Sequence, residues 1–389
     1  MKPWICILCV WSLCAAAQEH VDAVVAELNA ALASNHIAEA RALEQKLLAG
    51  PASLSTLLAA GVLFAQQEKM PDASAIFERC SEQFPSSFEA KYNLALARIA
   101  LTQYPSALET LNSIAPVTAD EKASVLYLTG KIFLNTNHLK EAQEKLASAY
   151  AQRPQEENYA LDLALLYIRS AAYVQAIRVL EPSIAAHPAS EDLALELALS
   201  RVLAGRYSDG IALCRKLQEQ DPALGIPQLI AAFGYCAQKN FDACKAEASA
   251  GLASRNPNPY LYYLRARAGW DSGSPEHSTE HRRMLEDVST AIRQMAACRA
   301  CLLLRSRMFE ASGDNGSAIA DVKTALEGDT QDASDWYRLA ELYRKEGRTE
   351  EASTALRQYR TIHDNRHDNG SNQEVESFRK QFLNTLGDH

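Results

Sequence analysis

Residues 336–356 read WYRLAELYRKEGRTEEASTAL, two short amphipathic patterns on either side of a glycine. The apolar residues of the first pattern recur at spacings of three and four: Trp336, Leu339, Ala340 and Tyr343. Such spacing places side chains on one face of an α-helix. Gly347 marks a turn, and Ala352 and Leu356 carry the same spacing into a second stretch. The segment therefore predicts two antiparallel helices joined by a tight turn.

The small residue of the second helix recurs along the chain at a nearly fixed interval. The positions are Ala73, Ala107, Ala142, Ala176, Gly210, Cys244, Ala318 and Ala352, with steps of 34, 35, 34, 34, 34, 74 and 34. Pro154, Pro188 and Pro222 close three successive units at the same interval of 34. A small side chain is needed where two helices approach closely, because protein interiors are packed without slack.

A helical hairpin repeated every 34 residues resembles the tetratricopeptide repeat (TPR) family, as an exported bacterial type. The resemblance covers roughly residues 20–364, and the first repeat is its weakest part. It implies an all-α protein, a right-handed superhelical solenoid of antiparallel hairpins with about ten repeats. It also implies a binding surface, since the motif is specific for fold and nearly silent on function.

The amino terminus has the pattern of a signal peptide over residues 1–17. Lys2 is followed by the apolar run ICILCVWSL at 5–13 and by three alanines at 15–17, so we expect cleavage before Gln18. An uncleaved anchor and a lipoprotein signal at Cys14 are the alternatives, and Leu13 is too large for the usual lipoprotein motif. The expected location is periplasmic or extracellular.

The rest of the chain divides into an array and a tail. We assign residues 18–364 to the solenoid, 365–371 to a polar linker, and 372–389 to a helix that caps the last repeat. Docking of that helix on a partner is the alternative. The step of 74 holds two repeats and six extra residues, an irregular insertion at about 272–287. We expect its second helix to start at Ser274–Pro275, because serine caps helices and proline suits their first turn.

Composition argues against several function classes. The formal charge is −9, with no run of basic residues longer than two, which disfavours nucleic acid and anionic membranes as partners. We find no nucleotide-binding loop, no GxSxG and no HExxH, and therefore expect no catalytic residue, cofactor or metal. His277 with His281 and His363 with His367 have metal-ligand spacing, but solvent-exposed histidines explain them better.

Six cysteines follow the predicted signal peptide. An even number in an exported protein permits disulfides. Cys298 and Cys301 form a CxxC pair that lacks the partners of a haem or zinc site, and Cys236 and Cys244 lie on opposite arms of one hairpin. These four are the candidate disulfide cysteines, with their pairing left open. Cys80 and Cys214 fall on apolar faces and are expected in the core.

The TPR resemblance also implies which residues face the concave groove, three before and one after the small residue of each first helix. The longest uncharged run of these groove positions is Leu161, Leu165, Leu195, Leu199, Leu229 and Phe233. An exposed apolar stripe marks a binding surface. The alternative is that the stripe packs on the protein itself.

These observations predict a non-catalytic interaction scaffold of the cell envelope, which binds a protein or peptide segment in its groove and has no membrane span after signal cleavage. The alternative function is a periplasmic carrier or chaperone for lipidic or unfolded clients.

Overall fold

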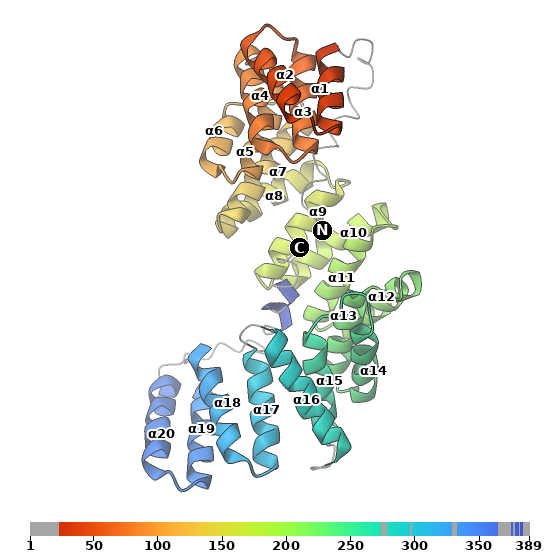
Figure 1. Cartoon of the computed structure of the whole chain (residues 1–389). Helices are drawn as coiled ribbons and strands as arrows, with labels where there is room; N and C mark the ends of the chain where they lie inside the picture. Colours follow the sequence, from red (N-terminus) through yellow and green to blue (C-terminus); the bar gives the residue numbers. More distant parts are fainter. Residues whose placement is uncertain are drawn as a thin grey trace. The chain divides into compact units, whose positions relative to one another are not determined.

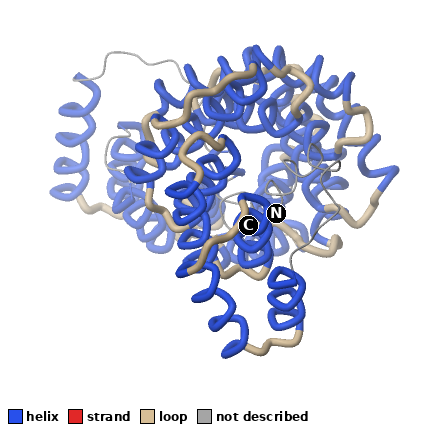
Figure 2. Tube along the Cα trace, turned by 90° about the horizontal axis from the view of Figure 1, so that it is seen from above, coloured by secondary structure: helices blue, strands red, loops and turns tan. Residues whose placement is uncertain are grey.

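A computed structural model describes residues 23–273, 278–295, 298–328 and 333–364, and a short C-terminal segment. The described residues of this C-terminal segment are Val375, Phe378, Arg379, Lys380, Phe382 and Leu383. Helices, turns and loops account for all of these ranges, with no strand among them (Figures 1 and 2). The predicted signal peptide 1–17 and linker 365–371 lie outside the described residues.

Twenty helices in the described ranges follow one another as ten successive pairs. They are α1 Ala23–Ala33, α2 Ile37–Ala49, α3 Leu54–Gln66, α4 Met70–Gln83, α5 Phe88–Ala100, α6 Tyr104–Asn112, α7 Ala119–Asn135, α8 Leu139–Gln152, α9 Glu157–Arg169, α10 Tyr173–Ala186, α11 Glu191–Leu203, α12 Tyr207–Gln220, α13 Gly225–Ala237, α14 Phe241–Leu252, α15 Tyr260–Asp271, α16 Thr279–Gln294, α17 Arg299–Ala311, α18 Asn315–Gly328, α19 Ala333–Lys345 and α20 Thr349–Asp364. The prediction of an all-α solenoid with about ten hairpins is confirmed, and the hand of the superhelix stays a prediction.

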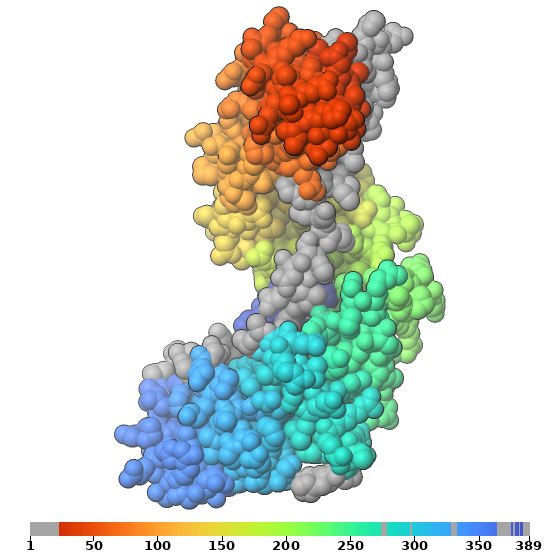
Figure 3. All heavy atoms as spheres, viewed as in Figure 1, coloured from red at the N-terminus to blue at the C-terminus, as the bar shows by residue number. Residues whose placement is uncertain are grey.

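The chain forms two compact units, divided between Leu166 and Tyr167. Unit 1 holds α1 to α8 and most of α9, and unit 2 holds the end of α9, the helices α10 to α20 and the C-terminal segment. Within each unit the colours of the space-filling view follow one another in bands, since each hairpin packs on its neighbours in sequence (Figure 3). Such nearest-neighbour packing is what defines a solenoid.

Each hairpin turns on one residue with left-handed backbone conformation. These ten residues are Asn35, Glu68, Thr102, Asn137, Ala171, Gly205, Lys239, Gly273, Gly313 and Gly347, with φ between 54° and 80°. Nine intervals separate them, of which eight are 33 to 35 residues and one, from Gly273 to Gly313, is 40. The six extra residues therefore follow the turn at Gly273.

The second helix of that repeat begins later than predicted. The described part of α16 starts at Thr279, and the Ser278 side chain accepts a hydrogen bond from the backbone N–H of His281 at 3.0 Å. The expected start at Ser274–Pro275 is therefore wrong, because Ser278, whose backbone is extended, caps the helix. Residues 274–277 lie outside the described residues.

The small residues pack where the two helices of a hairpin meet. Ala73, Ala107, Ala142 and Ala176 are completely buried. A β-carbon added to Gly210 of α12 would lie 2.6 Å from the Val202 side chain of α11 and 2.8 Å from the Ala198 carbonyl oxygen, too close for any larger residue. The repeat interval is thus set by steric contact.

Two ion pairs repeat the same arrangement in unit 2. Arg265 of α15 binds Asp287 of α16, and Arg305 of α17 binds Asp321 of α18, each through two hydrogen bonds of 2.7 to 2.8 Å. Both aspartates are less than a tenth exposed, so removal of either arginine would leave a buried carboxylate uncompensated. These pairs join the two helices of their hairpins from the polar side.

One carboxyl oxygen of α11 is buried, although the Glu196 side chain as a whole is part-buried. Glu196 Oε2 has no hydrogen-bond partner among the described residues. Burial, and then the nearby carboxylate of Asp192 one turn earlier, raise the pKa of Glu196 to about 7. Desolvation disfavours the charged form of an acid, so this group holds its proton in the folded protein up to neutral pH.

We expect Ala142→Leu to destabilise the protein by about 1–3 kcal/mol, because three added carbons have no room between α7 and α8. Gln143→Leu, which places the same side chain at an exposed position of α8, is the matched control. Thermal and urea unfolding measure both variants. Equal stability of Ala142→Leu and the parent protein would contradict the repeat register.

We expect stability to fall as the pH rises from about 4.5 to about 7. The folded protein binds the Glu196 proton more tightly than the unfolded chain does, so stability is greatest below the unfolded pKa and is lost as Glu196 ionises. Glu196→Gln should remove this dependence and stabilise the protein at pH 8 by on the order of 1–3 kcal/mol. Glu191→Gln, at an exposed position of the same helix, should keep it. Urea unfolding at several pH values decides between these outcomes.

Candidate functional site

The predicted groove positions divide between the two units. Leu161 and Leu165 are part-buried residues of α9 in unit 1. The other four belong to unit 2, with Leu195 and Leu199 on α11 and Leu229 and Phe233 on α13. The unit 2 set is therefore the part of the predicted groove that the structure brings together, since α11 and α13 are neighbouring first helices in contact.

These four side chains are more buried than residues of an open groove would be. Leu199 and Phe233 have no exposed surface, Leu229 retains 1%, and Leu195 alone is half-buried. The burial of Phe233 on α13 has a local cause, because an aromatic side chain from the C-terminal segment covers its ring.

Phe378 of the C-terminal segment stacks on Phe233. The two rings are nearly parallel at 5°, with centroids 3.8 Å apart, and Phe378 is completely buried. The ring of Tyr260 from α15 lies 5.8 Å from Phe378 at a tilt of 43°. Phe382, one turn after Phe378, is 4% exposed, and its ring lies 6.1 Å from that of Phe378. The tilted ring pairs add to the gain from burial, and the stacked pair buries the faces of both rings.

A cation of the same segment meets the end of α9. The Arg379 guanidinium donates hydrogen bonds to the backbone carbonyls of Ile168, at 3.4 Å, and of Arg169. The last carbonyls of a helix have no partner within the helix, and they carry the negative end of its dipole. A guanidinium is well suited to this position.

The predicted cap on the last repeat is therefore wrong. The described contacts of the C-terminal segment are with α9, α13 and α15, and Figure 1 shows its pieces, in dark blue, apart from α20. A cleft of about 510 Å³ lies among α18, α19 and α20, with Trp336 and Leu339 in its wall. The apolar face of the segment packs on Phe233 and Tyr260 instead of on hairpin α19–α20.

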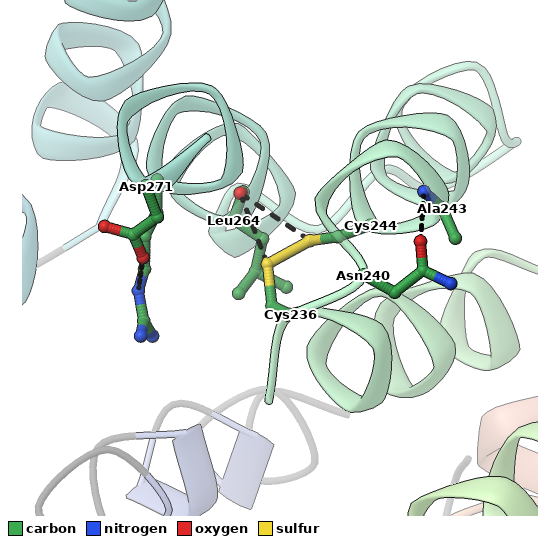
Figure 4. Close-up of a disulfide and its surroundings, with 7 residues drawn as sticks. Cys236, Asn240, Ala243, Cys244, Leu264 and Asp271 are labelled. Carbon is green, nitrogen blue, oxygen red and sulfur yellow. Dashed lines mark hydrogen bonds and ion pairs between the residues drawn. A yellow bond between two sulfur atoms is a disulfide. The ribbon is translucent and has the colours of Figure 1, made fainter. Parts of the chain in front are cut away.

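A disulfide lies one helical turn from Phe233. Cys236 of α13 is joined to Cys244 of α14, with their α-carbons 5.3 Å apart, so the two arms of this hairpin are covalently linked (Figure 4). The carbonyl oxygen of Leu264 from α15 lies 3.7 Å and 3.8 Å from the two sulfur atoms. The link fixes α13 against α14 beside Leu264 of α15.

The second disulfide joins Cys298 and Cys301 at the start of α17, again with α-carbons 5.3 Å apart. The other two described cysteines, Cys80 and Cys214, are free thiols in the core. Burial raises the pKa of the Cys80 thiol to about 12, and it also raises the pKa of Cys214. Both thiols are therefore protonated and unreactive at neutral pH.

The structure assigns no metal site to the histidine pairs. His281 is 3% exposed, with Nε2 3.1 Å from the Ser312 hydroxyl, so its predicted solvent exposure is wrong. The contact places this residue against the end of α17, where Ser312 is the C-cap. His363 is exposed, while His277 and His367 lie outside the described residues. No group of three metal-ligating side chains occurs in the described ranges.

The same groove rule, applied around Gly130 of α7, marks Tyr127 and Lys131, which form a polar cluster in unit 1. Lys131 binds both carboxylate oxygens of Asp162, at 2.8 and 2.9 Å, and Tyr127 donates to the same carboxylate. Tyr127 also stacks on Tyr159 with ring centroids 4.3 Å apart. These two positions of unit 1 thus combine charge with aromatic surface, whereas Leu195, Leu199, Leu229 and Phe233 of unit 2 are apolar.

Tyr260 and Arg379 of the C-terminal contact were not predicted from the sequence. Phe378 lies on the apolar face of the predicted C-terminal helix, but its neighbours in the chain do not indicate its partner. A search for aromatic residues flanking the predicted groove positions would have found Tyr260, the first residue of α15, which opens the hairpin after α13–α14. The pairing of Phe233 with Phe378 spans 145 positions and leaves no local signal.

Among the described residues, no helix combines the length and apolar character that a bilayer crossing requires. The comparison with curated proteins found no match. Among solved structures, the chain is similar to YrrB, a TPR protein with an unusual peptide-binding site, at 14% identity and a TM-score of 0.43, over 48% of this chain and 94% of that one. A tetratricopeptide repeat protein from Parabacteroides merdae matches at 14% identity and a TM-score of 0.38, over 70% and 92% of the two chains.

The assignment of this chain to a family rests on matches to family models. Three different models, each described as a tetratricopeptide repeat, match residues 64–132, 161–224 and 336–365. The matched segments lie near the start, the middle and the end of the array of hairpins, in the register set by the small residues. The chain is a tetratricopeptide repeat protein.

Proposed function

We propose that this chain is an exported, non-catalytic scaffold that binds a helical segment of a protein partner on the groove positions of unit 2. Tetratricopeptide repeats support a protein–protein interaction scaffold in general. The finer proposal depends on one observation, the seating of Phe378 on Phe233. A surface that buries an aromatic side chain from a distant segment has the shape and chemistry to accept a helix.

The chemistry of the surface favours an apolar or amphipathic ligand. Leu195, Leu199, Leu229 and Phe233 carry no charge, and α13 and α15 add the rings of Phe233 and Tyr260. Aromatic residues concentrate binding energy where they are packed and desolvated. A peptide recognised through its terminal carboxylate would need cations here, and these four positions offer none.

Location outside the cytoplasm is part of the proposal. It is supported by the signal pattern of residues 1–17 and agrees with two disulfides in unit 2, a chemistry of oxidising compartments. A scaffold of the cell envelope combines export with repeats that bind proteins.

The native protein should have the intact mass of residues 18–389 with both disulfides formed. Each disulfide lowers the mass by about 2 Da, because two hydrogens leave as the sulfurs join. Mass spectrometry of protein from its native source, before and after reduction, tests cleavage and oxidation together. Retention of Met1 would contradict export by a cleaved signal, and an unchanged mass on reduction would contradict the disulfides.

Leu195→Asp should weaken partner binding by about 10- to 100-fold, since burial of a leucine contributes about 1.5–3 kcal/mol. A photo-crosslinker at position 195 in the native envelope identifies the partner, and purified components give the affinities. Val174→Asp adds the same charge at a 54% exposed position of α10 and should bind normally. Circular dichroism controls for folding. If Leu195→Asp unfolds the protein, position 195 belongs to the core and the site is wrong.

A further inference from the structure

The C-terminal segment makes the kind of contacts that a bound peptide makes. It follows the last hairpin in sequence, yet its described contacts lie two to five hairpins earlier, on α15, α13 and α9. The residues between it and α20, 365–374, read NRHDNGSNQE and include only polar and charged side chains and one glycine. A short apolar segment beyond a polar tether is the arrangement of a ligand attached to its own receptor.

The contacts divide into two anchors and one orienting group. Phe378 and Phe382, four residues apart, are both nearly or fully buried and lie on one face of a helix. Arg379 lies beside the first anchor and contacts the carbonyl end of α9. Lys380 is exposed. The anchors supply apolar area, and Arg379 fixes the direction of the segment, because the dipole of α9 attracts a cation only at that end.

We propose that Phe233, Tyr260 and the carbonyl end of α9 form a receptor site for an amphipathic helix with aromatic residues at positions i and i+4 and an arginine at i+1, and that the C-terminal segment occupies this site until a partner helix displaces it. This inference rests on the proposed function, since it names the ligand class and the control of the same surface. The partner is thus a protein helix of the pattern Phe-Arg-x-x-Phe.

Attachment to the same chain makes the internal ligand a strong competitor. A tether of about ten residues gives an effective concentration in the millimolar range. An external helix of equal intrinsic affinity would bind the intact protein poorly. Loss of the internal anchors should therefore raise the affinity for an external helix, although nothing at the receptor site has changed.

The test uses the full chain and a fluorescent synthetic peptide of residues 372–389. Phe378→Ala/Phe382→Ala removes both anchors from the chain, and we expect this variant to bind the peptide at least about tenfold more tightly than the parent protein does. Lys380→Ala changes an exposed residue of the same segment and should bind as the parent does. Fluorescence anisotropy gives the dissociation constants. Equal affinity of the double variant and the parent would overturn the proposal.

Two controls locate the binding. Phe233→Ala added to the double variant should abolish the gain, and a peptide with both phenylalanines replaced by alanine should not bind. Peptide binding that survives Phe233→Ala would place the ligand elsewhere and overturn the receptor site. Light scattering should find the parent protein monomeric. If the parent protein is a dimer and the double variant is a monomer, the segment of a second copy occupies the receptor site. That result would overturn displacement within one chain.

Hydrogen exchange on the parent protein keeps the test decisive if the double variant does not fold. Excess peptide should increase amide exchange in residues 378–383 while α13 and α15 stay protected. If residues 378–383 lose protection only together with α13 and α15, the segment is part of the core and the proposal is wrong. The receptor site and the proposed function can fail separately. If the peptide binds through Phe233 but the natural partner binds Leu195→Asp as tightly as the parent protein, the receptor site stands and the proposed function is refuted.

Discussion

The close approach of the two helices in each hairpin is the constraint on which the structure depends. At Gly210 even a methyl group would meet both the Val202 side chain and the Ala198 carbonyl, and at Ala142 the surrounding helices leave no exposed surface. One small residue therefore has to recur once per repeat. Because each hairpin packs mainly on its neighbours, the same contact sets the spacing of successive first helices, which carry the groove positions.

The helical hairpins could be predicted because the signals that specify them lie close together in the sequence. Spacings of three and four, a small residue every 34 positions and one turn residue per hairpin all act within about 40 residues, so the sequence displays them directly. The structure repeats this register in the backbone, where even Thr102 and Ala171 adopt the left-handed conformation that the turn requires. The register fails only after Gly273, and the helix start and the exposure of His281 were mispredicted there.

The placement of the C-terminal segment could not be predicted, because it depends on a choice among similar surfaces. Its apolar face correctly predicted a docked helix, but every repeat of the array offers some apolar surface. The choice depends on the ring of Phe378 against Phe233 and Tyr260 and on Arg379 at the end of α9. These groups meet only after α9 to α15 have formed. No spacing in the chain encodes that meeting.

The ring of Phe233 would be an exposed apolar surface if the C-terminal segment left it. Surface able to bind a helix is also able to aggregate, because burial of apolar area is favourable with any partner. Two aromatic anchors contribute on the order of 3–6 kcal/mol at most, before the cost of ordering the segment. In the proposed displacement, the tether adds to this energy and keeps Phe233 covered in the free protein. A partner helix that also engages Leu195 would bury more apolar surface, so under the proposed function a longer helix has the energetic advantage.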